Sequence, residues 1–407
     1  MEEVEYSRVL YEFTDEQGNI GRIYLLDQAI GKAVCGQISH LLAEKIVETS
    51  CEASYRKTSE AISSMTGQTI SHTGAWKVVQ ALGEEVNGQE KENALLAKEN
   101  ESLGQHEAKL LFEEQDGVYL NLQGKDREKH GPMHEMKVAI AYEGAKQTGK
   151  ERFNLSGKVA CANFESAAEF LKRKEGAIAA HYNIDEINLR IFNGDGANWM
   201  KGNLIDDTVH YQLDTFHRNK AIIEHIRDPE ARKTLFKLLY SKQIDLLLDV
   251  IEAYSNSTED ENERDNFLKL LRYFQNNRDG LILYKRRGLE LPEPSEGIVY
   301  RNCGAMESNI YSLIARRMKR RRANWSIKGG NNMARMLTLK ATGRLHRTLS
   351  GFVPMCLPER YSREVETTLS AAKSPDKVGK GYNGFAHASI PPSQKWMKAL
   401  FALKPIC

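Results

Sequence analysis

The sequence lacks the features of a membrane, secreted or disordered protein. No apolar run in its 407 residues approaches the roughly 18 that a membrane-spanning helix needs. The acidic first residues lack the basic segment and apolar core of a signal peptide. Hydrophobic residues make up 41% and charged residues 28%, which excludes disorder as the main state. We therefore expect a cytoplasmic protein of about two to four domains with no membrane partner.

Paired cysteines are also missing. The six cysteines are scattered, and no Cys-x-x-Cys pair indicates a zinc ribbon or a redox motif. We expect them to be reduced thiols.

A large net charge is absent as well, but the charge is unevenly distributed. The formal net charge is only +2, yet residues 284–347 hold 15 Lys or Arg and 4 Asp or Glu. No acidic residue interrupts the 11 basic ones between Ser308 and Arg347. Such a field attracts phosphate, because each neutralised phosphate releases condensed counterions. Nucleic acid is the favoured partner; a solvated basic helix face or an anionic lipid patch is the alternative.

The N-terminal region predicts a β-hairpin followed by two short helices. Alternating apolar residues in the hairpin region, 1–30, surround the turn signal at 15–19, and the abrupt start looks more like the middle of a domain than a beginning. In the helical segment 31–83, Gly67 ends one helix and Ser71 can cap the next. Trp76, Val79 and Leu82 then repeat at the spacing of one buried face.

This helical pair resembles a helix-turn-helix, whose second helix enters a DNA major groove. The side chains expected to project toward DNA are His72, Thr73, Lys77 and Gln80. Any pair of antiparallel helices would give a similar pattern, so a purely structural hairpin stays open.

The rest of the chain predicts a mixed sheet with a helical insertion. Polar residues 84–109 predict a solvent-exposed connecting helix, and we expect 110–217 with 301–347 to form one domain. Strands are expected at 109–122, 135–142, 158–161, 187–192 and 208–213, with a helix at 166–180 and another before the last strand. This order is typical of an α/β fold with helices flanking a mixed sheet. Residues 218–300 predict an all-helical insertion with a buried stripe of Leu246, Leu247, Val250 and Ile251, and 348–407 form a C-terminal tail.

Three carboxylates occupy positions where this fold could bring them together. Asp116 interrupts an apolar strand, where an unpaired charge is costly. Asp195 lies between glycines at the end of the fourth strand, and Glu307 begins the helix after the insertion. Carboxylates with water and phosphate oxygens are the ligands of Mg²⁺, and two ions about 4 Å apart can catalyse phosphodiester chemistry. The alternative is a turn aspartate, a bulge aspartate and a helix-capping glutamate.

Four motifs in order carry a resemblance to a known family. They are Gln115–Val118, Asn193–Trp199, Leu213–His217 and Gly304–Asn309. Together they resemble the motif series of Mutator-like bacterial insertion-sequence transposases of the ISLre-two type. The resemblance implies a ribonuclease-H-like fold with a helical insertion, accompanied by the N-terminal helical DNA-binding domain. It also implies a catalytic and metal-binding triad of Asp116, Asp195 and Glu307 with Mg²⁺ or Mn²⁺.

The same resemblance implies an accessory motif at Asp214 and His217. His217 could orient a metal ligand, contact DNA or cap a helix. The basic run at 316–322 should continue the Glu307 helix, and its expected phosphate contacts are Arg316, Arg317, Arg320 and Arg321. A solvated helix end is the alternative.

The expected function is that of a DNA transposase, which hydrolyses phosphodiesters at the ends of an insertion sequence and transfers the strand to a target. Its expected partners are double-stranded DNA and further copies of itself, as a homodimer or higher oligomer. It should associate with the nucleoid when bound to DNA. Two alternatives stay open: a catalytically inactive DNA-binding protein descended from a transposase, and a metal-dependent nuclease that cuts without joining.

Overall fold

The computed structural model describes residues 9–14, 18, 20–23, 40–67, 69–99, 104–203, 207–351 and 370–371. The chain forms two compact units, one of Met1–Leu82 with Leu345–Cys407 and one of Gly83–Arg344. None of the described helices combines the length and apolar character needed to cross a membrane.

The first unit contains a small sheet and short helices. β1 (Tyr11–Thr14) and β2 (Ile20–Ile23) form the predicted antiparallel hairpin, and β12 (Ser370–Ala371) pairs with β1 as a third strand. The helices are α2 (His40–Glu52), α3 (Tyr55–Thr66), the first part of α4 (His72–Lys98) and α14 (Leu345–Gly351). Most of the expected tail, at 352–369 and 372–407, lies outside the described residues.

The turn between α3 and α4 is confirmed. Ser54 Oγ accepts a hydrogen bond from the Lys57 amide at the start of α3. Gly67 ends this helix at φ 70°, in the left-handed region that favours glycine. Ser71 Oγ accepts from the Gly74 amide at 2.9 Å, so it caps α4.

The expected connecting helix at 84–109 is confirmed as far as Lys98, where α4 ends, but it is not fully exposed to solvent, because one side of it packs within the second unit. Arg173 donates to the Asn87 backbone oxygen at 3.1 Å, and Arg335 donates to Glu90 at 2.8 Å. A Cβ on Gly176 would lie 2.6 Å from Ala94 N, so the two helices are in close contact. The polar residues of this segment bind buried arginines. A polar sequence alone does not show whether such residues face solvent or bind other buried polar groups.

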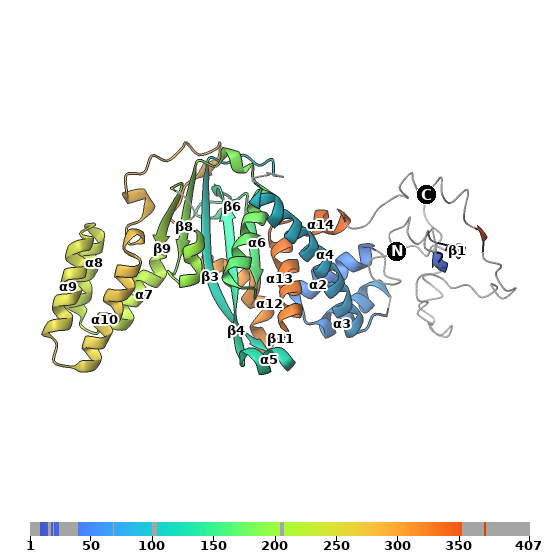
Figure 1. Cartoon of the computed structure of the whole chain (residues 1–407), viewed down its shortest axis with the longest axis horizontal. Helices are drawn as coiled ribbons and strands as arrows, with labels where there is room; N and C mark the ends of the chain where they lie inside the picture. Colours follow the sequence, from blue (N-terminus) through green and yellow to red (C-terminus); the bar gives the residue numbers. More distant parts are fainter. Residues whose placement is uncertain are drawn as a thin grey trace. The chain divides into compact units, whose positions relative to one another are not determined.

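The second unit is built on a mixed sheet that contains all five predicted strands (Figure 1). Its main path is β7 (Val159–Asn163), β4 (Met133–Tyr142), β3 (Leu110–Leu122), β8 (Leu189–Gly194) and β9 (Val209–Leu213). β4 is antiparallel to β3 and β7, whereas β8 and β9 run parallel to β3. A short β11 (Asn324–Trp325) pairs with the far end of β3.

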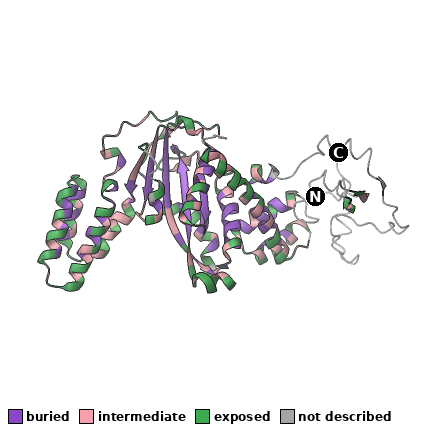
Figure 2. Cartoon of the chain, in the orientation of Figure 1, coloured by how far each residue is buried: buried purple, intermediate pink, exposed green. Residues whose placement is uncertain are grey.

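Helices flank this sheet, as expected. α6 (Ala167–Ala179) packs against β7 and β4, and α13 (Ile327–Ala341) packs against β7. The strands at the centre are almost continuously buried, which Figure 2 shows as a purple core between partly green helices. A sheet buried on both faces explains why β3 and β4 read as apolar runs.

Several elements differ from the expectation. β5 (Gly144–Gln147) and β6 (Phe153–Ser156) form an unpredicted hairpin, to which β10 (Ile298–Val299) adds a strand. Between β8 and β9 lies a 3-10 segment, η3 (Asn198–Asn203), in place of the expected helix. The remaining short elements are α5 (Gly124–His130), η2 (Ile184–Glu186), η4 (Arg278–Gly280) and η5 (Tyr284–Arg286).

The expected long helix from Glu307 through the basic run is interrupted. α11 (Met306–Ile310) passes into a π-helical segment, η6 (Tyr311–Ala315), and then into α12 (Arg316–Met318). The helix ends there, and η7 (Arg320–Arg322) is a separate 3-10 turn. π-helical segments are rare and frequently occur at functional sites.

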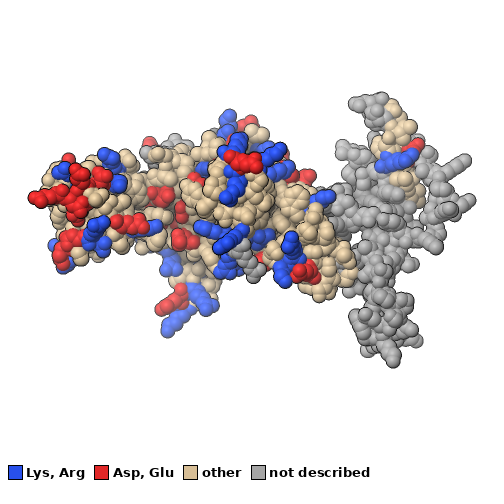
Figure 3. Space-filling model, turned by 90° about the horizontal axis from the view of Figure 1, so that it is seen from below, with Lys and Arg blue, Asp and Glu red and all other residues tan. Residues whose placement is uncertain are grey.

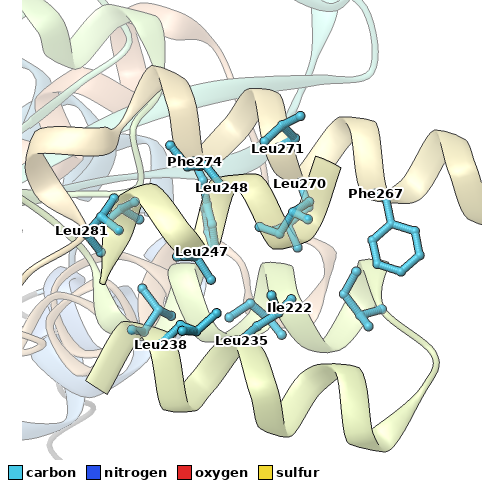
Figure 4. Close-up of a cluster of buried hydrophobic side chains, with 14 of the residues drawn as sticks. Ile222, Leu235, Leu238, Leu247, Leu248, Phe267, Leu270, Leu271, Phe274 and Leu281 are labelled. Carbon is cyan, nitrogen blue, oxygen red and sulfur yellow. The ribbon is translucent and has the colours of Figure 1, made fainter. Parts of the chain in front are cut away.

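The helical insertion has a core of its own (Figure 4). It contains α7 (Thr215–His225), α8 (Pro229–Tyr240), α9 (Ile244–Ser257) and α10 (Glu261–Asn276). Leu235, Leu247 and Phe274 are among its fully buried residues. The predicted stripe was wrong at Leu246, which is 47% exposed, because Ile244 and Leu248 complete the buried face instead.

A buried ion network ties β3 to its neighbours. Glu113 is fully buried and pairs with Lys174 of α6 and, at 2.5 Å, with Arg190 of β8. Arg190 also pairs with Glu175 at 2.8 Å. Burial opposes the ionisation of Glu113, but Arg190 and Lys174 outweigh it and lower its pKa to about 2. The network therefore joins α6, β3 and β8 through charge.

We predict that Glu113→Gln lowers the free energy of unfolding at pH 7 by about 3 kcal/mol, because Lys174 and Arg190 lose their fully buried partner and keep the more exposed Glu175. The stabilisation by ionised Glu113 is complete above its ordinary pKa of 4.5 and is lost as pH falls toward about 2. Urea unfolding at several pH values should show the two proteins converging in acid, whereas the exposed control Glu107→Gln should follow the wild type. A constant difference across this range would contradict the assignment.

Candidate active site

The parallel pairing of β3 and β8 brings two of the three predicted carboxylates to the same sheet edge. Glu114 lies opposite Asn193 in the register of these strands. Asp116 follows Glu114 by two residues within β3, and Asp195 follows Asn193 by two residues, just past the end of β8, so the two carboxylates are brought near each other where the strands are spaced about 4.8 Å apart. β9 pairs with β8 up to Leu213, which places Asp214 beside them.

Glu114 brings the third carboxylate to this edge. Its Oε2 accepts hydrogen bonds from the amides of Gly304 at 2.9 Å and Met306 at 3.2 Å, and its Oε1 accepts from the amide of Ala305 at 3.1 Å. These amides belong to the turn directly before Glu307. The start of α11 lies nearly two hundred residues after β3 in the sequence. These hydrogen bonds nevertheless hold it against Glu114, which precedes Asp116 by two residues.

Side chains complete the surroundings of the Glu114 carboxylate. Tyr142 Oη donates to Oε1 at 2.5 Å, and Asn193 Nδ2 donates to Oε2 at 3.2 Å. Burial raises the pKa of Glu114, and the donors from Tyr142, Ala305 and Gly304 oppose that shift. Five donors satisfy both oxygens, as a buried carboxylate requires.

A pocket of about 240 Å³ opens above this network. Asp116, Asp214, His217 and Glu307 line it together with Gln115, Asn193, Thr215, Phe216, Cys303, Gly304 and Met306. Asp195 is not among the lining residues. The structure therefore brings four of the five predicted site and accessory residues to one pocket and Asp195 to the adjacent strand end.

The charges at this edge influence one another. Burial raises the pKa of Asp116 to about 6, and the charges of Asp195 and Glu307 add to this shift. The Gly117 amide, which donates to Asp116 Oδ1 at 2.7 Å, and the charge of His217 act in the opposite direction. The carboxylates are thus close enough to repel one another and are only partly compensated by the protein.

Asp214 and His217 form a pair at the start of α7. Asp214 Oδ1 accepts from the amides of Phe216 at 2.9 Å and His217 at 3.2 Å, so the aspartate, not the histidine, caps the helix. His217 Nδ1 lies 3.3 Å from the same oxygen. This contact, with the charge of Asp116, raises the pKa of His217, and the pKa of Asp214 is lowered, because its hydrogen bonds outweigh its burial.

The loop that carries Asp195 is held by the helical insertion. Asp195 Oδ1 accepts from the Ala197 amide at 2.8 Å, and Tyr273 of α10 donates to the Asp195 backbone oxygen at 2.8 Å. Gly196 adopts φ 85°, and a Cβ there would lie 2.3 Å from Asn277 Oδ1. Glycine is therefore required at this position, and the insertion determines where Asp195 lies.

The candidate carboxylates are of the chemical type that binds a divalent cation, although the structure does not arrange them as a metal site. Among the described residues, no group of three or more His, Cys, Asp or Glu side chains is arranged so as to hold a metal ion. Asp116, Asp195 and Glu307 nevertheless present carboxylate oxygens, the ligands that Mg²⁺ and Mn²⁺ prefer. Their mutual repulsion, seen at Asp116, is what a bound cation would relieve.

Sequence reasoning missed Glu114 and Glu135. A Cβ on Gly117 would lie 2.2 Å from Glu135 Oε1, so the Glu135 carboxylate occupies the space that a side chain at this position of β3 would need. Burial and the charge of Asp195 raise the pKa of Glu135. The signal for Glu114 was present in the consecutive polar residues Glu113, Glu114 and Gln115 within an otherwise apolar strand.

The predicted DNA-reading helix is partly corrected. The buried face of α4 contains Ala75, Val78, Val79 and Leu82, whereas Trp76 is 43% exposed. His72, Thr73 and Lys77 are exposed beside Trp76, but Gln80 is buried and cannot reach a groove. The error arose because Trp76 was counted as apolar and core-forming, which shifted the expected face around the helix.

The described basic side chains of the run at 316–322 are exposed to solvent or lie against aromatic rings. Arg316 is exposed, while the Arg317 guanidinium lies 5.2 Å from the centre of the Trp325 ring. Arg320 is exposed and donates to the hydroxyl of Tyr311, whose ring it also covers. The side chain of Arg321 lies outside the described residues.

We predict that Glu114→Gln detaches the turn that precedes Glu307. The amide nitrogen of glutamine would face backbone N–H groups, and each unsatisfied donor costs about 1–3 kcal/mol. Hydrogen exchange should therefore accelerate at the amides of Gly304, Ala305 and Met306, while the exposed control Glu128→Gln leaves these rates unchanged. Unchanged exchange in Glu114→Gln would show that the turn is held by other contacts.

Comparison with known proteins gives a family. Residues 1–350 match the model of UPF0236, described as an uncharacterised protein family. A UPF0236 protein in the vanSb 3′ region of Streptococcus gallolyticus is 25% identical over 328 residues, which cover 78% of this chain and 67% of that protein. Two UPF0236 proteins of Caldanaerobacter subterraneus subsp. tengcongensis are each 23% identical, over 347 and 348 residues, covering 84% of this chain and 66% of each relative. The chain thus spans about two thirds of the length of these relatives.

The expected membership of the Mutator-like insertion-sequence transposases was wrong. The model that matches is that of UPF0236, and the curated relatives carry that family name alone. The four motifs are short acidic segments, three of them at strand or helix ends and Gln115–Val118 within β3, and short segments of this kind recur in unrelated proteins. The chain belongs to UPF0236, an uncharacterised protein family.

Proposed function

We propose that this protein cleaves DNA phosphodiesters with a divalent metal ion and joins the freed 3′-hydroxyl to a target strand, which is the chemistry of a DNA transposase. The observation that carries the proposal is the placement of Asp116, within β3, beside Asp195, which directly follows the end of the parallel strand β8, with Glu307 held near them by Glu114. Three carboxylates at one sheet edge, next to a pocket, suit phosphoryl transfer, which depends mainly on positioning and charge neutralisation.

The topology supports a ribonuclease-H-like fold as part of this proposal. Numbered along the chain, the five main strands lie in the order 3-2-1-4-5, and only the second runs against the others. Asp195 and Asp214 lie directly after the carboxyl ends of the parallel strands β8 and β9, where open α/β sheets bind their ligands, and Asp116 lies near them within β3.

Each site residue has a task in the proposed reaction. Asp116, Asp195 and Glu307 would hold Mg²⁺ or Mn²⁺, which would neutralise charge on the attacked phosphate. Glu114 positions Glu307 through the backbone, and Tyr273 positions Asp195. His217 lines the pocket, and Asp214 favours its cationic form. In that form it can stabilise a nearby phosphate oxygen.

Further observations favour DNA as the substrate. The exposed residues His72, Thr73, Trp76 and Lys77 follow a glycine turn on α4, which supports a helix-turn-helix in the first unit. In the second unit, Figure 3 shows Asp and Glu gathered over the helical insertion, where 244–265 holds eight acidic residues and one basic. That end repels phosphate, so DNA would approach along the basic residues at 316–322.

The relatives support mobility of the encoding DNA. The names of the two Caldanaerobacter proteins join eleven and four locus designations within one organism. Copying of a DNA element within a genome leaves one protein at many loci. Assembly as a dimer or higher oligomer on DNA, and association with the nucleoid, belong to the same proposal.

We predict that Glu307→Gln abolishes Mg²⁺-dependent cleavage of the DNA that flanks the gene but leaves DNA binding within about twofold, because only one carboxylate charge changes. The exposed control Glu296→Gln should cleave like the wild type. Gel analysis of labelled duplex measures cleavage and strand transfer separately. Full cleavage by Glu307→Gln would contradict the proposed active site, and cleavage without joined products would identify a nuclease.

For the helix-turn-helix, we predict that Lys77→Ala weakens binding to the flanking DNA about tenfold, corresponding to roughly 1.4 kcal/mol, and binding to random duplex much less. Lys91→Ala, exposed further along the same helix, is the matched control. Fluorescence anisotropy measures both affinities. An equal loss on the two duplexes would restrict Lys77 to nonspecific phosphate contact.

A further inference from the structure

A large cavity lies beside the turn that precedes Glu307, and we call it the Lys158 pocket. Its volume is about 1150 Å³. The β5–β6 hairpin, the segment 300–305, η6 and the end of α13 form its walls. Small-molecule sites usually enclose roughly 300–1,000 Å³, so this pocket has room for an extended ligand.

Its lining is basic and contains no carboxylate. Lys158, Lys285, Arg301 and Arg344 line it, with no Asp or Glu among the lining residues. Lys158, Lys285 and Arg301 form no ion pair within the described ranges; Lys158 Nζ lies 3.4 Å from Asn309 Oδ1, and Lys285 donates to the Tyr300 backbone oxygen. Unpaired cations in a shared concave site attract an anion strongly.

Aromatic rings stand among these cations. The Arg301 guanidinium stacks 4.0 Å from the centre of the Phe153 ring, and Tyr300 lies beside it in the chain. Cations that bind phosphates, interleaved with rings on which bases stack, are typical of sites for unpaired nucleic acid strands. A duplex keeps its bases paired inside and cannot present them to such rings.

The pocket adjoins the candidate active site. Cys303 and Gly304 line both this pocket and the one that contains Asp116 and Glu307, so the two pockets share a wall. A strand that leaves the active site across this wall would meet the Lys158 pocket next. We propose that this pocket binds the unpaired DNA segment adjacent to the scissile phosphate, through phosphate contacts of Lys158 and Arg301 and base stacking on Phe153. The inference rests on the proposed function.

The test uses the full chain and fluorescein-labelled single-stranded dT₁₂, with a duplex of equal length for comparison. Lys158→Gln/Arg301→Gln should weaken dT₁₂ binding at least tenfold and duplex binding less than twofold. Each lost single-strand phosphate contact lowers the slope of log K against log salt by about 0.7, so the double variant should lose about 1.4. Lys233→Gln/Lys237→Gln, which removes two exposed cations of α8, is the matched control and should change neither affinity.

A crosslinking experiment uses the unaltered protein, so its result does not depend on whether the double variant folds. In the unaltered protein, 4-thiothymidine at the centre of dT₁₂ should crosslink to peptides that contain Phe153 or Tyr300. Deoxythymidine monophosphate and inorganic phosphate should compete only at far higher concentration than dT₁₂. Competition by the monophosphate at equal concentration would show that the pocket binds a mononucleotide and not a strand. Crosslinks confined to other peptides would show that the strand binds elsewhere and would contradict the proposed site.

The two proposals fail separately. Unchanged dT₁₂ binding by the double variant, with normal duplex cleavage, would refute the Lys158 pocket and leave the proposed function intact. Absence of metal-dependent cleavage by the wild type would refute the proposed function.

Discussion

The carboxylate of Glu114 joins the central strand to a turn that lies nearly two hundred residues further along the chain, and the candidate site depends on this contact. Three consecutive backbone amides donate to it, from Gly304, Ala305 and Met306. Since Asp116 follows Glu114 by two residues on the same strand face, one buried anion fixes the separation between Asp116 and Glu307. Its five donors offset part of the cost of burying that charge, and the pKa of Glu114 stays raised by burial.

Other parts of the second unit serve the same edge of the sheet. Glu113 faces the opposite side of β3 and joins it to α6 and β8 through Lys174 and Arg190. The helical insertion reaches back through Tyr273 to hold the Asp195 loop. The adjacent residues Glu113 and Glu114 thus face opposite sides of β3, and the first joins the strand to α6 and β8 while the second holds the turn before Glu307.

Much of this architecture could be predicted from the sequence. The five strands and the helix at 166–180 followed from the periodicity of the apolar residues. The register that places Asp116 beside Asp195 could not, because pairing partners are set by long-range packing. The second half of α4 was misread because its polar residues bind buried arginines, and the family was misjudged because short acidic motifs recur at strand ends.

The central claim is that Asp116, Asp195 and Glu307 form one divalent-metal site. Anomalous diffraction from crystals of the full chain soaked in Mn²⁺ tests it most directly. The account predicts a manganese peak bonded to the carboxylates of Asp116 and Asp195 at about 2.1 Å, a typical divalent-metal to oxygen distance, with Glu307 bound to this ion or to a second one about 4 Å away. A manganese peak held by other residues alone, or no peak at this edge of the sheet, would contradict it.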